Sequence, residues 1–469
     1  MNRSGLPAII VAIVVAARGL ATLPAGYWQG EEIRFAQALL TYDGSAPLFV
    51  AAARFINFFI RDPFRSLLAL SLAATIGGAI LLARAGSDLL GNEWNGAAAA
   101  LILYLSPAML VFTPLPNAEA FDVALVALAL FALARTNRVL LAIACAAMAI
   151  EWFGPIAPLT SDNVWALLGR FIAHPWGSRF LAVPLLIAAV TGAVVLRRRI
   201  AMIAFAFVFT AYCVATGSMT TGVQSVLPAL PVIALFVAAA FARWPAIAIT
   251  AVVIYGAASI LYVRPILEAR RGASPPMAAI AYAAANLEPD AVLLADPKLE
   301  SHASLIAEQR AVAPIKDLGS HVERSTYLLV QGAGPMSRTF SWPDSDAYGK
   351  ITSAGYRVIS LRKLQHPYIP RIGVYAMEST VADGPWHWLA REAVIDLPSS
   401  LDRVRIRLPV RAPISSNTIV INETATTIMR GETRTIDIQP AARISIRSTN
   451  SWAAAGRDLA IQLLSIEHR

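Results

Sequence analysis

The sequence predicts a polytopic α-helical membrane domain with interfacial helices, then a small α/β domain and a C-terminal β-sandwich of the jelly-roll kind. Three observations lead to this prediction. Of the 469 residues, 57% are hydrophobic and 15% are charged, whereas soluble domains carry about 25% charged residues. Apolar runs long enough to cross a bilayer recur up to about residue 265. Beyond Arg271 helical and strand-like runs alternate, and strands alone follow.

The apolar runs predict about nine spans, with roughly 8–11 possible. We expect them at about residues 6–23, 64–83, 96–113, 118–134, 139–153, 180–196, 200–217, 225–241 and 244–263. The run 46–60 is shorter, and Arg54 and Asn57 interrupt it, which favours an interfacial helix. The domains predicted are therefore a membrane domain at 1–265, an α/β domain at 272–380 and a β-sandwich at 381–469.

The charge distribution predicts an orientation. The net charge of +9 divides into +7 for residues 1–271, which contain no lysine, and +2 for the remainder. With the N-terminus in the cytoplasm, every short inner turn is basic, as the positive-inside rule requires. The C-terminal domains then lie outside the cell membrane. Arginine beside spans indicates orientation and contact with membrane lipids, and no nucleic-acid motif is present.

Acidic residues close to the spans are the first candidates for a site, because acids at membrane depth are costly and often functional. Glu31 and Glu32 follow the first span, and Asp43 lies a little further on. Glu119 and Asp122 are spaced to share one helical face, where they could line a cavity or bind a cation. The alternative for both pairs is capping of a helix N-terminus.

Basic and aromatic residues of the outer segments are further candidates. A phosphate could be held by Arg54, Arg61, Arg170 or Arg179, although each could also be an interfacial anchor. His174 could transfer a proton or be structural.

Trp386 and Trp388 lie on one side of any strand, where they could stack on a sugar ring or pack in the core. No histidines fall at metal-ligand spacing, so no metal is assigned, although a divalent cation remains possible.

The segment Gly26–Leu48 resembles the polyprenol-phosphate-sugar-dependent glycosyltransferases of the type-C superfamily, in the branch of bacterial protein mannosyltransferases and aminoarabinose transferases. Glu31-Glu32 corresponds to the acid pair after the family's first span, and Pro47-Leu48 to its later proline element. Residues 224–231, Gln-Ser-Val-Leu-Pro-Ala-Leu-Pro, are similar to the family's Arg-Tyr-Leu-Leu-Pro-Ala-Leu-Pro. The resemblance extends over about residues 5–265.

The resemblance implies a glycosyltransferase in the bacterial inner membrane, multi-pass, with periplasmic C-terminal domains. The donor would be a polyprenyl-phosphate-linked sugar, and the acceptor an envelope glycan, a lipid or a protein. Glu31 would act as the general base, with Glu32 second, and the anomeric carbon would be inverted. A site arginine of the family is replaced by Gln224, and a lysine by Ser45-Ala46. Two alternatives stay open: a catalytically degenerate protein that binds or presents envelope glycan, and a transporter of lipid-linked sugars.

Overall fold

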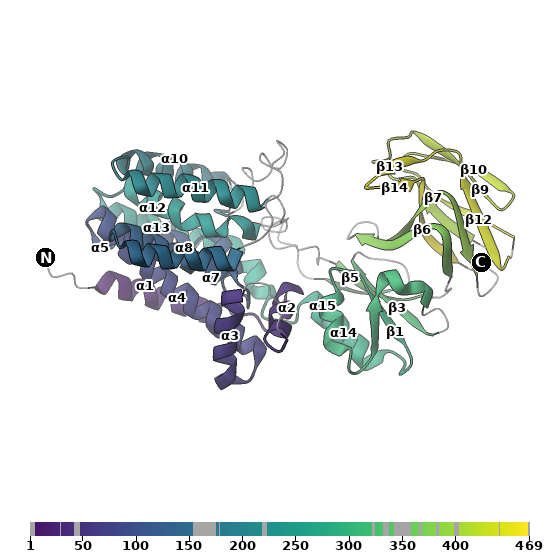
Figure 1. The fold of residues 1–469 in the computed structure, drawn as a ribbon, viewed down its shortest axis with the longest axis horizontal. Helices are drawn as coiled ribbons and strands as arrows, with labels where there is room; N and C mark the ends of the chain where they lie inside the picture. The colour runs from purple at the N-terminus through teal and green to yellow at the C-terminus, as the bar shows by residue number, and fades with distance from the viewer. Residues whose placement is uncertain are drawn as a thin grey trace. The chain divides into compact units, whose positions relative to one another are not determined.

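The structure is a computed structural model that divides the chain into two compact units (Figure 1). The helical unit contains the chain up to Ser274, and the C-terminal unit begins at Pro275. The residues described are 5–28, 30–41, 47–152, 175–177, 179–217, 223–320, 324–331, 337–341, 358–364, 368–380, 384–397, 403–439 and 441–467.

The helical unit is built from helices whose ends follow local sequence signals. The Asp62 side chain accepts a hydrogen bond from the Arg65 amide, with Pro63 in the first turn of the helix that follows. Ser106 and Pro107 act in the same way at the start of α6, two helices later. The helices are α1 (Leu6–Ala21), α2 (Gly30–Ala38), α3 (Pro47–Ile60), α4 (Pro63–Leu90), α5 (Glu93–Tyr104), α6 (Pro107–Phe112), α7 (Glu119–Ala134), α8 (Arg138–Trp152), α10 (Arg179–Val195), α11 (Ile200–Gly217), η1 (Val223–Ala229), α12 (Leu230–Ala240) and α13 (Pro245–Ala269).

Two helices in the described residues, α4 and α13, are long and apolar enough to cross a membrane. Four shorter apolar helices lie at Leu6–Ala21, Pro47–Ile60, Phe180–Val195 and Val226–Ala240. The run expected as one span at 96–113 is divided into α5 and α6, because Ser106-Pro107 starts a new helix. Nine spans are therefore not confirmed. The interfacial helix expected at 46–60 corresponds to α3.

The outer surface of the helical unit is apolar. Large side chains of several helices are exposed to a degree that monomeric soluble proteins rarely show. They include Ile9, Ile13, Leu20, Phe58, Val139, Ile143, Phe180, Ile187, Val190, Ile254 and Leu261. Together with α4 and α13, this surface indicates a membrane protein.

Small residues allow two helices of this unit to pack closely. A Cβ atom on Gly96 of α5 would lie 2.1 Å from the carbonyl oxygen of Ala83 in α4. A Cβ on Gly86 would lie 2.8 Å from the Cα of Gly96. Such contact between backbones is typical of helices in membranes, where small residues replace the hydrophobic effect as the basis of packing.

A five-stranded sheet opens the C-terminal unit, in the order β2-β1-β3-β5-β4. Its first three strands, β1 (Val292–Ala295), β2 (Ala311–Pro314) and β3 (Thr326–Gln331), are parallel. The other two, β4 (Ser337–Ser341) and β5 (Val358–Lys363), pair antiparallel. The helices of this part are α14 (Pro275–Asn286) and the short α15 (Glu300–Ala303), with 3-10 turns η2 (Ser304–Ile306) and η3 (Ile315–Ser320). This is the α/β arrangement that the alternating runs predict.

The remaining strands form one antiparallel sheet in the order β10-β9-β12-β7-β15-β8-β11, with β6 also paired to β7. β10 and β11 lie at opposite ends of this order, yet only three residues connect them, so the sheet must curl until its ends meet. Arg434 of β11 donates to Thr426 of β10 at 3.0 Å across that seam. The strands are β6 (Ile369–Thr380), β7 (Gly384–Asp396), β8 (Arg403–Arg407), β9 (Ser416–Ile421), β10 (Thr424–Met429), β11 (Thr433–Asp437), β12 (Arg443–Ser448) and β15 (Ile461–Glu467), with a separate hairpin β13 (Trp452–Ala454) and β14 (Arg457–Leu459).

The result is a barrel-like sheet, and the jelly-roll sandwich is not confirmed. β6, expected at the end of the α/β domain, pairs with β7 of this sheet. One hydrophobic core includes Leu328 and Val330 of β3 together with Leu389 and Ile395 of β7. The two sheets of the C-terminal unit therefore share buried contacts.

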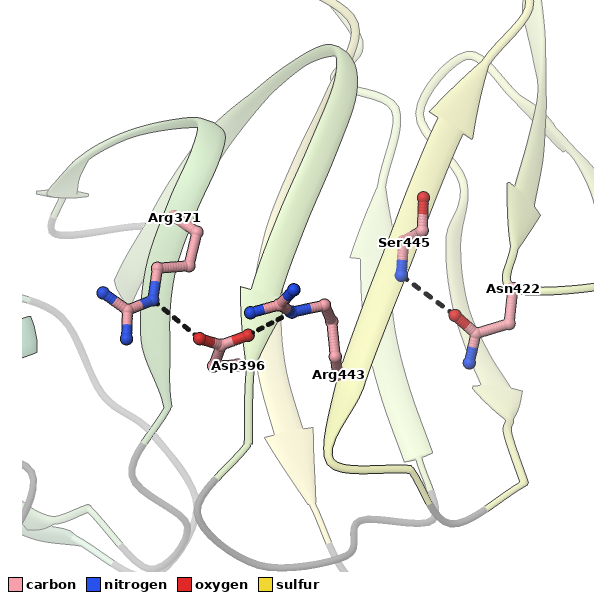
Figure 2. Close-up of polar contacts among 5 residues, drawn as sticks. All are labelled: Arg371, Asp396, Asn422, Arg443 and Ser445. Atoms are coloured by element: carbon pink, nitrogen blue, oxygen red, sulfur yellow. Dashed lines mark hydrogen bonds and ion pairs between the residues drawn. The ribbon is translucent and has the colours of Figure 1, made fainter.

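Polar contacts tie the strand ends of the barrel-like sheet together (Figure 2). Asp396, at the end of β7, accepts from Arg371 of β6 at 2.7 Å and from Arg443 of β12 at 2.5 Å. These two guanidinium groups lower the pKa of Asp396 to about 2. In the neighbouring turn, Asn422 accepts from the Ser445 amide at 2.9 Å.

Candidate active site

The acid pair predicted from the sequence begins α2, but its two members lie in different environments. Glu32 is fully buried, and its Oε2 accepts a hydrogen bond from the backbone amide of Trp28 at 2.7 Å. Glu32 thus reaches back from the first turn of α2 and fixes the chain where it enters the helix; capping of the helix amides stays a prediction. Glu31 is exposed on the other side of the same turn. Of the pair, Glu31 is the carboxylate that a substrate can reach.

The carboxyl group of Glu31 has a perturbed proton affinity. Partial removal from water by the surrounding chain raises its pKa above the ordinary value of 4.5, and the nearby charge of Arg34 opposes that rise. A carboxylate with a raised pKa is a stronger proton acceptor at neutral pH than an ordinary one. This property suits a general base.

Glu119 and Asp122 lie in the first turn of α7, as the i, i+3 spacing predicts. Glu119 is buried, and it interacts electrostatically with both Glu31 and Asp122. Asp122 is half-buried and accepts a hydrogen bond from Trp152. The acids of α2 and α7 therefore lie within electrostatic range of one another, although about ninety residues separate them in the chain.

A fifth carboxylate, Glu151 at the end of α8, was not among the candidates. It interacts electrostatically with Asp122. Its Oε2 accepts from the amides of Leu48 and Phe49, at 2.8 and 3.3 Å, in the first turn of α3. An acid at the end of an apolar run was the available sequence signal, but no spacing rule connects residues so far apart.

Oxygens of this cluster that have no hydrogen-bond partner among the described residues include Glu119 Oε2, Asp122 Oδ1 and Glu151 Oε1. Buried carboxylate oxygens need hydrogen bonds or a cation, so the arrangement is suited to accepting from the hydroxyl groups of a sugar. Among the described residues, no group of three or more acidic, histidine or cysteine side chains is arranged to hold a metal ion. The carboxylate cluster (Glu31, Glu32, Glu119, Asp122 and Glu151) is our candidate active site.

A buried arginine lies beside this cluster and was also missed. Arg270 follows α13, and its guanidinium donates to the carbonyl of Val111 and lies 5.8 Å from the ring of Trp28. It interacts electrostatically with Glu32. Because the amide of Ala25 donates to the Arg270 carbonyl at 3.0 Å, the segment after α1 is held against the end of α13.

The arginines predicted as phosphate ligands lie in different environments. Arg54 donates to the carbonyls of Ala38 and Thr41, both at 2.7 Å, and so terminates α2. Arg61 is exposed and has a left-handed backbone, with φ of 57°, directly after α3. Asp43, Arg170 and His174 lie outside the described residues, as do the side chains of Arg179 and Gln224.

The two tryptophans of β7 are not equivalent. Trp386 is buried, with 6% of its surface exposed, so its ring packs inside the C-terminal unit. Trp388 is half-buried and packs edge-on against Trp452, with 5.7 Å between the rings. Carbohydrate binding at these residues stays a prediction. Of the two, Trp388 is the one whose side chain is partly exposed and could contact a sugar.

Comparison with known protein families finds no family model that matches the chain, and no curated protein matches it either. Among solved structures, two cryo-EM structures of the arabinofuranosyltransferase AftD from Mycobacteria are similar, one of them a mutant. Sequence identity is 12% and 11%, and the TM-score is 0.41 for both. The alignments cover 99% of this chain but only 61% and 59% of the AftD chains. A similarity of this size defines neither the fold nor the activity.

Proposed function

We propose that this protein is an integral membrane glycosyltransferase. It moves a sugar from a polyprenyl-phosphate donor to a lipid, glycan or protein acceptor on the extracytoplasmic face. The observation that carries the proposal is the convergence of Glu31, Glu119, Asp122 and Glu151 next to α2 and α3. A cluster of carboxylates beside apolar helices matches a reaction in which hydroxyl groups meet a lipid-linked sugar.

In the proposed reaction, the Glu31 carboxylate removes the proton from the acceptor hydroxyl. The hydroxyl oxygen forms a bond to the anomeric carbon while the bond from that carbon to the phosphate oxygen breaks. The sugar is transferred with inversion, polyprenyl phosphate leaves with the bonding electrons, and Glu31 later releases its proton to water. A positioned base of this kind contributes roughly 10²–10⁴-fold to the rate.

The other carboxylates position the sugar and do not react. Glu119 and Asp122 have oxygens available to accept from hydroxyl groups, which would orient the anomeric carbon toward Glu31. Arg34 is exposed one helical turn after Glu31, where its charge can stabilise the leaving phosphate.

In this proposal α3 is an interfacial helix, and it would hold the reaction at the membrane surface. Phe55, Phe58 and Phe59 are exposed on α3, as expected of a helix that inserts its apolar face among lipids. The proposed topology is multi-pass in the inner membrane, with the N-terminus cytoplasmic and the C-terminal unit periplasmic.

One alternative has a specific observation in its favour. Ser45-Ala46 and Gln224 stand where the type-C glycosyltransferases that the sequence resembles carry basic residues. A site without those charges could bind or present envelope glycan without reacting. The transporter alternative has no comparable support.

The test is transfer from radiolabelled undecaprenyl-phosphate sugars in proteoliposomes. Glu31→Gln should reduce the rate by roughly 10²-fold or more, and Glu31→Asp should retain part of it. Glu93→Gln, a change in the first turn of α5, is the matched control and should be silent. Undiminished transfer by Glu31→Gln would exclude Glu31 as the base. Absence of transfer by the wild type from every donor, with glycan binding retained, would favour the alternative.

A further inference from the structure

A cavity of about 430 Å³ lies between the ends of α1 and α13, away from the carboxylate cluster. Its walls include Arg18 and Thr22 from the end of α1, and Ile260, Arg264 and Leu267 from α13. Leu110 of α6, Glu268 of α13 and Arg271 also line it. None of the five carboxylates of the candidate active site lines this cavity.

The charges around the cavity are not balanced. Arg264 forms an ion pair with Glu268 at 2.7 Å, so those two charges cancel. Arg18 and Arg271 have no carboxylate partner within the described part of the chain, which leaves the cavity with two uncompensated positive charges.

Of these two arginines, Arg18 is buried, with only 8% of its surface exposed, so its charge has the greater need of a partner. Its guanidinium donates to the hydroxyl of Thr113 at 2.9 Å and to the carbonyl of Met109, which are neutral acceptors. Its Nε has no hydrogen-bond partner in the structure described. A buried cation held only by neutral groups is costly, and a counter-anion in the adjoining cavity would remove that cost.

The rest of the wall identifies the kind of anion. Leu110, Ile260 and Leu267 are apolar, and Ile260 and Leu261 continue as exposed apolar surface along α13. A small hydrated anion would gain nothing from these side chains, whereas an amphiphile gains from both parts of the site. Arginine beside an apolar groove at a helix end is the chemistry that recognises a lipid phosphate.

We propose that the cavity between α1 and α13 binds the phosphate headgroup of an anionic membrane phospholipid. Arg18 and Arg271 bind the phosphate, and one acyl chain lies along Leu267 and Ile260. The site is separate from the carboxylate cluster and does not depend on the proposed glycosyl transfer. Its occupant would join the end of α1 to the end of α13.

The experiment is native mass spectrometry of the full chain released from detergent, titrated with dioleoyl phosphatidylglycerol or dioleoyl phosphatidylcholine. We expect phosphatidylglycerol to be retained about tenfold more strongly, because its headgroup has a net negative charge, whereas the choline of phosphatidylcholine offsets the charge of its phosphate. Arg18→Gln and Arg271→Gln should each weaken its retention about tenfold. Arg271 is exposed, so Arg271→Gln tests the site even if Arg18→Gln fails to fold. Arg243→Gln, at an exposed arginine that does not line the cavity, is the control.

Each other outcome overturns the proposal. Equal retention of the two phospholipids, or an equal loss in Arg243→Gln, would show that the cavity does not select a headgroup. Displacement of phosphatidylglycerol by inorganic phosphate at equal concentration would assign the site to a free anion. Displacement by undecaprenyl phosphate at far lower concentration would assign it to a prenyl lipid. Because glycosyl transfer is not measured, failure here leaves the transferase proposal standing, and the converse also holds.

Discussion

Glu151 accepts a hydrogen bond from the backbone amide of Leu48 at 2.8 Å, and so joins the end of α8 to the start of α3 across 103 residues of sequence. The first amides of a helix have no partner within the helix, and an acidic side chain satisfies them. Here that side chain comes from another helix. The contact therefore orders α3 and α8 relative to each other, and with them one wall of the carboxylate cluster.

We expect Glu151→Ala to lower the free energy of unfolding by about 1–2 kcal/mol, the usual cost of losing an N-terminal cap. Thermal unfolding of the full chain in detergent measures the change. Glu268→Ala is the control, because Glu268 is an exposed glutamate of α13 that pairs only with Arg264 in the described residues. Equal melting temperatures for the two variants would contradict the capping role.

The raised pKa of Glu31 predicts how transfer depends on pH. The base is active when ionised, so the rate should fall as the pH drops through a value above 4.5, the ordinary pKa of glutamate. Below that value the rate should fall about tenfold per pH unit. Glu31→Gln should remove this acidic limb, and Glu31→Asp should keep it. A limb of unchanged position in Glu31→Gln would assign the titration to another group.

The raised pKa of Glu31 also predicts how Glu31→Gln affects stability, which distinguishes a loss of catalysis from a loss of folding. A carboxyl group with a raised pKa in the folded state favours folding while it is protonated, and this contribution is lost as the pH rises through the folded pKa. At neutral pH, Glu31→Gln should therefore unfold at the same temperature as the wild type or a higher one. A large loss of stability would mean that lost transfer reflects misfolding.

A third prediction concerns His387, which is buried in β7 with its Nδ1 2.7 Å from the carbonyl oxygen of Tyr375. Burial lowers its pKa from 6.5 to about 4. Between these values an unfolded chain takes up a proton and the folded chain does not. Stability is therefore complete above pH 6.5 and falls as the pH drops toward 4, by about 3 kcal/mol for this group.

His302 is also buried, and its pKa is likewise lowered to about 4. The two histidines should contribute similar slopes, so His387→Gln should remove about half of the loss between pH 6.5 and 4. Urea unfolding of the full chain, followed by tryptophan fluorescence at several pH values, measures it. A slope equal to that of the wild type would place the titration elsewhere.

The sequence predicted the parts of this fold that depend on local patterns. The apolar run at 46–60 predicted the helix α3, and the strand-like runs beyond residue 381 predicted strands such as β8. The closure of the C-terminal sheet was not predicted, because it depends on β10 and β11 occupying opposite ends of the strand order. No local pattern encodes that order.

For the site, spacing predicted that Glu119 and Asp122 share a turn. Their electrostatic interaction with Glu31 arises only because α2 and α7 both pack against α4. Arg54 is a residue whose predicted role the structure does not support. A cation near a membrane surface was a reasonable phosphate ligand, but its guanidinium binds the end of α2 instead. Whether an arginine binds a ligand or a carbonyl depends on contacts that sequence spacing does not contain.

The last prediction concerns Asn422, in the two-residue turn between β9 and β10. Its φ of 52° lies in the left-handed region, which asparagine tolerates better than most residues. Its Oδ1 accepts from the Ser445 backbone amide at 2.9 Å (Figure 2). The backbone amide of Asn422 donates to the Ser445 carbonyl at 2.8 Å. The side chain thus holds the turn against β12 while the backbone keeps a conformation that a β-carbon normally disfavours.

Three substitutions separate these two effects. Asn422→Asp keeps both the acceptor and the backbone preference, so it should change the free energy of unfolding least. Asn422→Gly keeps the backbone but loses the acceptor, for a cost of about 1 kcal/mol. Asn422→Ala loses both, and about 2–3 kcal/mol is expected. Urea unfolding gives the order; if alanine and glycine prove equal, the left-handed backbone carries no strain, and the hydrogen bond to Ser445 alone stabilises the turn.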